Sequence, residues 1–138
     1  MRILALDHGT ARVGCAISDP TGTIPRPLDV IAPPDPQAVA ELVAEHEVDL
    51  VVVGLPVSLS GGEGPQAREA RAFKDALAEL LDVPVVTYDE RLTTRLAERS
   101  ARAGAAAAPD ALAAAHLLDS YLAFRRSSPR REREGRRG

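Results

Sequence analysis

The strongest constraint on the fold is an uninterrupted apolar run over residues 50–53, in which three of the four residues are β-branched valines. Such a run favours a central strand that is buried on both faces, because helices then cover both sides of the sheet. A second apolar run, over residues 3–6, ends at Asp7 and predicts another buried strand. The chain is therefore expected to adopt an α/β fold.

The remaining elements follow from periodicity, turn residues and helix caps. Pro25 and Pro27 confine one strand to a sheet edge, because proline cannot donate to a ladder. Further strands are expected over residues 13–18, 24–31 and 83–88, and helices over residues 36–47, 66–81, 93–102 and from 110 through 122. The buried stripe of the second helix is expected to contain Ala70, Phe73, Leu77 and Leu80. This order predicts a five-stranded mixed sheet flanked by helices.

Length and charge indicate one folded domain with a basic tail. The 138 residues suit a single core, expected over residues 1–124. Residues 125–138 hold seven Arg and two Glu and lack apolar periodicity, so they are expected to be a disordered tail. The tail carries +5 and the preceding residues −8, for a net charge of −3. If the partner is a nucleic acid, its negative phosphates have to bind a protein whose folded part is itself negatively charged.

Two classes of protein are excluded by what the sequence lacks. Cys15 is the only cysteine, so neither an intrachain disulfide nor a cysteine-cluster metal site can form, and we expect it to be an inert core thiol. No apolar run approaches the ~18–20 residues that a membrane span needs, so no membrane partner is expected.

Acidic residues fall where strands end or a helix begins. Asp7 closes the first strand, Asp89 and Glu90 close the fifth, and Asp110 opens the last helix. If the first and fifth strands are parallel neighbours, Asp7 and Glu90 share the cleft at the carboxyl ends of the strands, with Asp110 above them. Converging carboxylates repel one another unless a cation lies between them, and oxygen ligands favour Mg²⁺ or Mn²⁺. The alternative is that each acid is a turn residue or, for Asp110, a helix N-cap.

Four segments, in order, resemble the motifs of the YqgF/RuvX family of pre-16S ribosomal RNA nucleases and Holliday-junction-resolvase-like proteins. They are D-H-G-T-A-R-V-G from residue 7, G-L-P-V-S-L-S-G from residue 54, D-E-R-L-T-T from residue 89, and D-A-L-A-A-A from residue 110. The resemblance covers nearly the whole chain before the tail, and the third motif is the most specific of the four.

The resemblance implies an RNase H-like fold, a cytoplasmic location and metal-dependent hydrolysis of phosphodiester bonds by two metal ions. The implied catalytic residues, which are also the metal ligands, are Asp7, Glu90 and Asp110. Asp89 would either substitute for one of these ligands or contact a ligand without touching the metal. The cleft loop would comprise Gly9, Gly54, Pro56 and Gly61, whose glycines permit close approach of a backbone. The implied function is trimming of the 5′ end of pre-16S rRNA during ribosome biogenesis.

Arginines are the candidate contacts to nucleic acid. Arg12 is expected to orient a phosphate, and Arg91 to contact a phosphate or pair with Asp89. Arg95, Arg99 and Arg102 are spaced to share one helix face that either contacts phosphates or is simply solvated. The Ala-rich connector over residues 101–109 is shorter than in typical family members, which usually carry lysines there. The tail is either a nucleic-acid-binding arm or a solubilising terminus.

Other functions stay open on the sequence alone. A Holliday-junction or branched-DNA resolvase would act as a homodimer, whereas the preferred substrate is RNA, on its own or within a pre-ribosomal particle. A non-catalytic nucleic-acid-binding module is a further alternative, although all three motif acids are retained. Gly9 and Thr10 also fit the phosphate hairpin of actin/hexokinase-type ATPases. His8 is interpreted as a turn residue.

Overall fold

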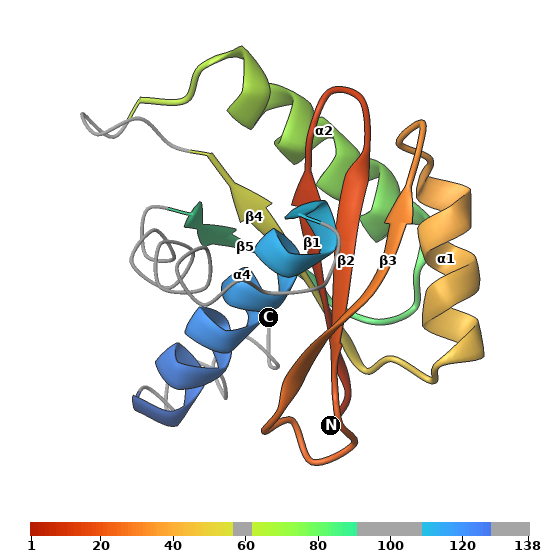
Figure 1. The fold of residues 1–138 in the computed structure, drawn as a ribbon. Helices are drawn as coiled ribbons and strands as arrows, with labels where there is room; N and C mark the ends of the chain where they lie inside the picture. Colours follow the sequence, from red (N-terminus) through yellow and green to blue (C-terminus); the bar gives the residue numbers. More distant parts are fainter. Residues whose placement is uncertain (57–61, 91–108, 128–138) are drawn as a thin grey trace.

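The computed structural model describes residues 1–56, 62–90 and 109–127 of the chain. Five strands form one sheet in the order β3-β2-β1-β4-β5 (Figure 1). The strands are β1 (Ile3–His8), β2 (Val13–Ser18), β3 (Pro25–Ile31), β4 (Leu50–Leu55) and β5 (Val85–Asp89). The predicted five-stranded mixed sheet is confirmed, and β3 lies at an edge, as its prolines indicated.

The pairing of the strands corrects one expectation. The first three strands form an antiparallel meander, whereas β4 pairs in parallel with both β1 and β5. Strands β1 and β5 are therefore parallel but are not neighbours, because β4 lies between them. Any contact between Asp7 and Glu90 has to pass over β4.

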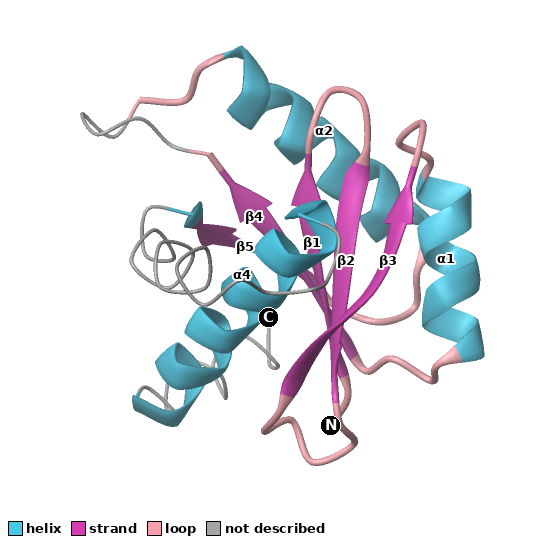
Figure 2. Ribbon diagram, in the orientation of Figure 1, coloured by secondary structure: helices cyan, strands magenta, loops and turns pink. Residues whose placement is uncertain are grey.

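Helices pack on both faces of the sheet, so the fold has three layers, with the sheet in the middle (Figure 2). One face packs against α1 (Pro36–Glu45) and α2 (Pro65–Leu80), through a core that includes Leu4, Val51 and Leu77. The other face packs against α4 (Pro109–Ser127), through a core that includes Ile3, Val52 and Leu118. Successive strand residues serve alternate faces, and all six residues of β4 are buried, as its apolar run predicted.

Several boundaries differ from the sequence-based predictions. Helix α1 ends at Glu45, because Glu47 adopts a φ of 54° that no α-helix accommodates. Leu80 was wrongly placed in the buried stripe: it is 50% exposed at the last turn of α2, and Leu81 packs against the core instead. Strand β5 begins at Val85 rather than residue 83, and α4 extends to Ser127, beyond the expected end of the folded domain at residue 124.

Other expectations can be compared directly with the structure. Asp35 caps α1 by accepting a 3.0 Å hydrogen bond from the Gln37 backbone N–H, and Cys15 is buried. Asp110 is the second residue of α4, so it lies within the first turn and not at the N-cap. Within the described ranges, no helix has the length and apolarity needed to cross a membrane. The predicted helix over residues 93–102 and most of the tail lie outside the described residues.

Candidate active site

The site begins with an aspartate between two glycines. Asp7 shares the α4-facing side of β1 with Ile3 and Ala5, because alternate strand residues face the same way. Across the antiparallel β1–β2 pair, Asp7 lies opposite Gly14. On the other side, the parallel β1–β4 register ends at Leu6 opposite Val53, which places Gly54 beside Asp7. The row across three strands therefore has a side chain only at its centre.

Gly54 provides the passage through which Glu90 reaches Asp7. A Cβ atom on Gly54 would lie 2.6 Å from Glu90 Oε1 and 2.9 Å from Leu117 Cδ2, closer than real Cβ contacts. Glu90 follows β5 directly, and its side chain crosses β4 at this gap to hydrogen-bond with Asp7. Gly54 was predicted to permit close approach of a backbone, and in the structure it gives room to the side chain of Glu90.

Gly14 performs the equivalent task for α4. A Cβ atom at this position would lie 2.0 Å from the backbone oxygen of Asp110 and 2.5 Å from its carbonyl carbon. The first turn of α4 therefore rests directly on β2, which places Asp110 at the same edge of the sheet as Asp7. Gly14 is not among the predicted site residues, although a hairpin starting from Asp7 brings the two into register.

The end of β5 is anchored by an aromatic residue. The Tyr88 hydroxyl lies 2.9 Å from Ser120 Oγ on α4, and its ring packs edge-on against Tyr121 at a centroid distance of 5.4 Å. Tyr88 faces α4 opposite Gly54, and Glu90 lies two residues further along. This anchor fixes the backbone from which the Glu90 side chain extends.

Glu90 is the most perturbed carboxyl group of the site. Burial, followed by the hydrogen bond with Asp7 and the charges of Asp7 and Asp89, raises the pKa of Glu90 to about 9. Glu90 therefore carries a proton near neutral pH, and that proton relieves the repulsion between the two carboxyl groups. Strongly shifted acids of this kind concentrate at functional sites.

Asp110 has a different partner. Its Oδ2 lies 3.4 Å from Arg12 Nη1, and both side chains are about half exposed. Arg12 belongs to the β1–β2 turn, which is closed by a 2.8 Å hydrogen bond from the Gly9 backbone N–H to the Arg12 carbonyl. Asp110 thus shares the cleft with Asp7 and Glu90 but is ion-paired on its own side.

These groups line one cleft of about 350 Å³. From the predicted site it brings together Asp7, Glu90, Asp110, Arg12, Gly9 and Pro56, whereas Gly54 lies beneath it. Asp89 contributes charge to Glu90 but is not among the lining residues. The other predicted residues, Gly61, Arg91, Arg95, Arg99 and Arg102, fall outside the part of the chain that the structure describes.

The opposite wall of the cleft contains residues that the sequence analysis missed. Helix α2 supplies Gln66 and Glu69, and Glu69 Oε2 accepts a 3.2 Å hydrogen bond from Thr10 Oγ1. His8 lines the cleft with its ring 4.9 Å from that of Phe73, and burial lowers its pKa. Nothing in the sequence separates Glu69 from any other acid on an exposed helix face.

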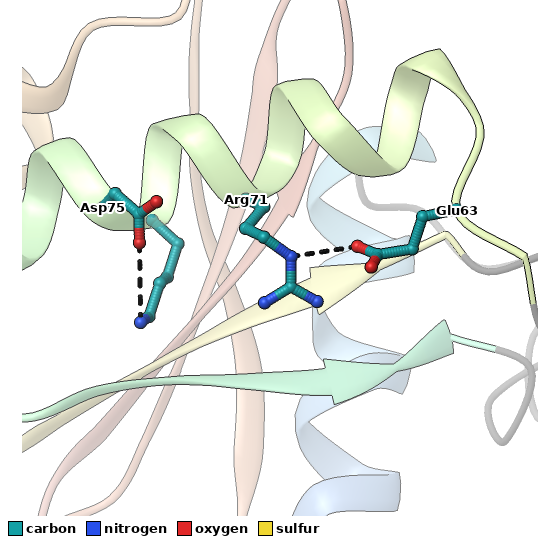
Figure 3. Close-up of polar contacts among 4 residues, drawn as sticks. Glu63, Arg71 and Asp75 are labelled. Atoms are coloured by element: carbon teal, nitrogen blue, oxygen red, sulfur yellow. Dashed lines mark hydrogen bonds and ion pairs between the residues drawn. The ribbon is translucent and has the colours of Figure 1, made fainter.

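An exposed ion pair lies near the start of α2. Glu63 Oε1 lies 2.9 Å from Arg71 Nε, linking the segment before the helix to its second turn (Figure 3). The next ion pair on α2 joins Lys74 and Asp75 at 3.7 Å. None of the four residues of these pairs lines the cleft, which α2 reaches through Gln66 and Glu69.

The donor set fits a divalent cation through two carboxylates. Among residues 1–56, 62–90 and 109–127, no three Asp, Glu, His or Cys side chains form a group ready to hold a metal ion. Asp7 and Glu90, however, are in contact and need a positive charge between them, which a proton or a cation can supply. Mg²⁺ typically binds through one or two carboxylates together with waters and a substrate phosphate. The pair therefore fits such an ion, with Asp110 within the same cleft.

The mixed sheet, with Asp7, Glu90 and Asp110 lining one cleft, matches the RNase H-like nuclease fold that the sequence motifs implied. The family model described as RuvX, Holliday junction resolvase, matches residues 1–124, and the chain belongs to this family. A protein of Pelotomaculum thermopropionicum, named "Putative pre-16S rRNA nuclease", is 42% identical over 147 residues, covering 99% of this chain and 95% of the relative. A relative of the same name from Chloroflexus aurantiacus is 44% identical over 142 residues, covering 96% and 93%.

Solved structures agree on the fold. RuvC of Thermus thermophilus, in complex with a Holliday junction substrate, superposes with a TM-score of 0.65 at 18% identity, covering 92% of this chain and 95% of RuvC. The Holliday junction resolvase of fowlpox virus gives a TM-score of 0.53 at 14% identity, covering 90% and 99%. These structures confirm the predicted RNase H-like fold. The family and its relatives confirm the predicted enzyme class, a nuclease that hydrolyses phosphodiester bonds.

Proposed function

We propose that this nuclease uses Mg²⁺ or Mn²⁺ to cleave RNA at the 5′ end of pre-16S rRNA during ribosome biogenesis. The observation that carries the proposal is the Asp7–Glu90 pair, brought together over Gly54 in the cleft that also contains Asp110. The choice of RNA is supported by the names of the relatives, which cover nearly the whole of both chains.

The residues of the cleft divide the chemical work. Asp7 and Glu90 would hold the divalent cation, and Asp110 would complete the set from the start of α4. When bound, the cation activates a water molecule and stabilises the leaving oxygen. Glu90 would have to release its proton before it could act as a ligand, so its affinity for a cation would rise with pH. Arg12 orients the phosphodiester, and Asp89 holds negative charge behind Glu90.

The proposal also covers the residues outside the cleft and the place where the protein acts. The catalytic domain, expected over residues 1–124, extends to the end of α4 at Ser127. The Arg-rich tail after it supplies a sequence-independent arm for the phosphate backbone. Arg91, Arg95, Arg99 and Arg102 add contacts to phosphates, and Gly61 completes the cleft loop. The protein acts in the cytoplasm on the RNA of a pre-ribosomal particle. The charge pattern supports this arrangement, because positive charge is concentrated in the tail while acids line the cleft.

The test is a cleavage assay on RNA containing the 5′ region of the precursor, with Mg²⁺ or Mn²⁺. Asp7→Asn should lower the rate at least about 10³-fold, because it removes a ligand and the partner of Glu90. Asp75→Asn, which neutralises an acid on the exposed side of α2, is the matched control and should cleave like wild type. Equal rates for wild type and Asp7→Asn would overturn the assignment of the site.

A junction resolvase is the second candidate, favoured by the description of the family model. The same assay on four-way DNA junctions separates the two, because a resolvase should cut the junction symmetrically, acting as a homodimer. Cleavage of the RNA precursor at a rate well above that of the junction supports the first proposal. Nucleic-acid binding without cleavage of either substrate would indicate a non-catalytic binding module.

A further inference from the structure

Charge is unevenly distributed among the residues that line the cleft. Four of the described lining residues carry carboxyl groups: Asp7, Glu69, Glu90 and Asp110. Among those same lining residues, Arg12 is the single Arg or Lys. A phosphodiester entering the cleft therefore depends on Arg12 for attraction by a side chain of the cleft itself. The guanidinium, however, already faces Asp110 at 3.4 Å.

The backbone of this ion pair is fixed on both sides. The Arg12 carbonyl closes its turn with the Gly9 N–H, and a Cβ atom on Gly9 would lie 3.1 Å from the same carbonyl oxygen. The Asp110 backbone rests on Gly14. The two side chains, by contrast, are 55% and 42% exposed. Either side chain can change partner by rotation, without any movement of the sheet or of α4.

We infer that Arg12 is an exchangeable counterion, which pairs with Asp110 until a divalent cation takes that carboxylate and then binds the phosphate of the nucleic acid. The inference rests on the proposed function, because it assumes both a cation and a phosphodiester in the cleft. Arg12 cannot serve Asp110 and a phosphate at once, so the two binding events are coupled and each tightens the other. Because the pair is exposed, the coupling is limited to about fivefold.

The first measurement is Mn²⁺ binding to the full chain without nucleic acid, by titration calorimetry. Arg12→Gln removes the competitor for Asp110 and should tighten Mn²⁺ binding by about three- to fivefold. In an Asp110→Asn background the same substitution should have no further effect, because the contested carboxylate is gone. Arg68→Gln is the matched control: it removes one positive charge from an exposed position of α2 that does not line the cleft. It should change the affinity less than about twofold.

The second measurement is RNA binding with and without Mn²⁺, recorded by stopped-flow anisotropy before cleavage occurs. Mn²⁺ should tighten RNA binding by wild type, and Arg12→Gln should lose about fivefold of that gain while Arg68→Gln keeps it. The exchange would be overturned if Arg12→Gln and Arg68→Gln tightened Mn²⁺ binding equally, or if Arg12→Gln kept its full effect in the Asp110→Asn background. Either result would leave the proposed function standing. A wild-type chain that binds no Mn²⁺ would overturn the proposed function and the exchange with it.

Discussion

The two faces of the sheet differ sharply at the end where the parallel strands finish. On the face covered by α1 and α2, side chains such as Leu6, Val13 and Val53 fill the space, and all three are fully buried. On the α4 face, the same strands present Gly14, Asp7 and Gly54 in one row. One face is closed by apolar packing, whereas the other omits two side chains and places a carboxylate between the gaps.

The contrast is confined to one row. Lower on the α4 face, Ile3, Ala5 and Val52 are as completely buried as their counterparts on the opposite face. The glycine row therefore forgoes apolar burial only where Glu90 and the start of α4 have to approach Asp7. Because each buried methylene contributes about 0.8 kcal/mol, such a row makes sense as a functional feature and not as a way of stabilising the fold.

The largest expected effect comes from closing the passage over β4. Gly54→Ala places a methyl group 2.6 Å from Glu90 Oε1, too close for a real contact, so the glutamate has to withdraw from Asp7. We expect cleavage to fall by about 10³-fold, since the ligand pair is separated. The fold should persist, because the atoms met by the new methyl belong to side chains and not to the backbone. Gel-based cleavage rates and circular dichroism spectra measure the two quantities.

The matched control is Val53→Ala, one residue earlier on the opposite face. It should lower the free energy of unfolding by about 2 kcal/mol through loss of buried methyl groups. The folded protein should still cleave normally. If Gly54→Ala and Val53→Ala affected cleavage alike, the two faces would not differ in function.

Gly14→Ala tests the second gap and should act on stability. Its methyl would meet the Asp110 backbone at 2.0 Å, and a backbone at the start of a packed helix cannot rotate away. We expect a loss of about 3 kcal/mol in the free energy of unfolding, measured by urea denaturation. A change below about 0.5 kcal/mol would show that α4 shifts freely on β2.

Sequence patterns predicted the acidic residues of this site more completely than the gaps that its glycines leave. Asp7, Glu90 and Asp110 each lie at an element end within a motif, which predicted them together, and all three line the cleft. The role of Gly14 and the crossing of β4 depend on strand order and register, which a local pattern does not encode. Leu80 was misplaced because helical periodicity continues into the last turn, where the core has already ended. Glu69 acquires meaning only from the cleft beside α2.

Glu90→Gln should stabilise the protein at neutral pH while abolishing cleavage. The pKa of Glu90 is about 9 in the folded chain, against an ordinary value of 4.5. Its stabilising contribution is therefore fully present below pH 4.5 and is lost as the pH rises towards 9. Glutamine imitates the protonated form at every pH, so the variant should gain about 2 kcal/mol over wild type at pH 7.

Urea unfolding at pH 4, 7 and 9, with a chelator present, measures this difference. The gap between variant and wild type should widen from pH 4 to pH 9. Stability curves that stay parallel over that range would contradict the raised pKa of Glu90. Glu79→Gln, at an exposed position of α2, is the control and should leave the gap near zero.

The smallest effect is expected where charges meet in water. Glu63→Gln removes the 2.9 Å ion pair between Glu63, which is 38% exposed, and Arg71, which is 46% exposed (Figure 3). We expect the free energy of unfolding to change by about 0.5 kcal/mol or less, and the change to disappear at 1 M salt. The same Glu→Gln substitution should thus change the free energy of unfolding in opposite directions at the two positions. Solvent screens the charge of Glu63, whereas burial beside Asp7 penalises the charge of Glu90. A loss above about 2 kcal/mol for Glu63→Gln would mean that exposure does not set this difference.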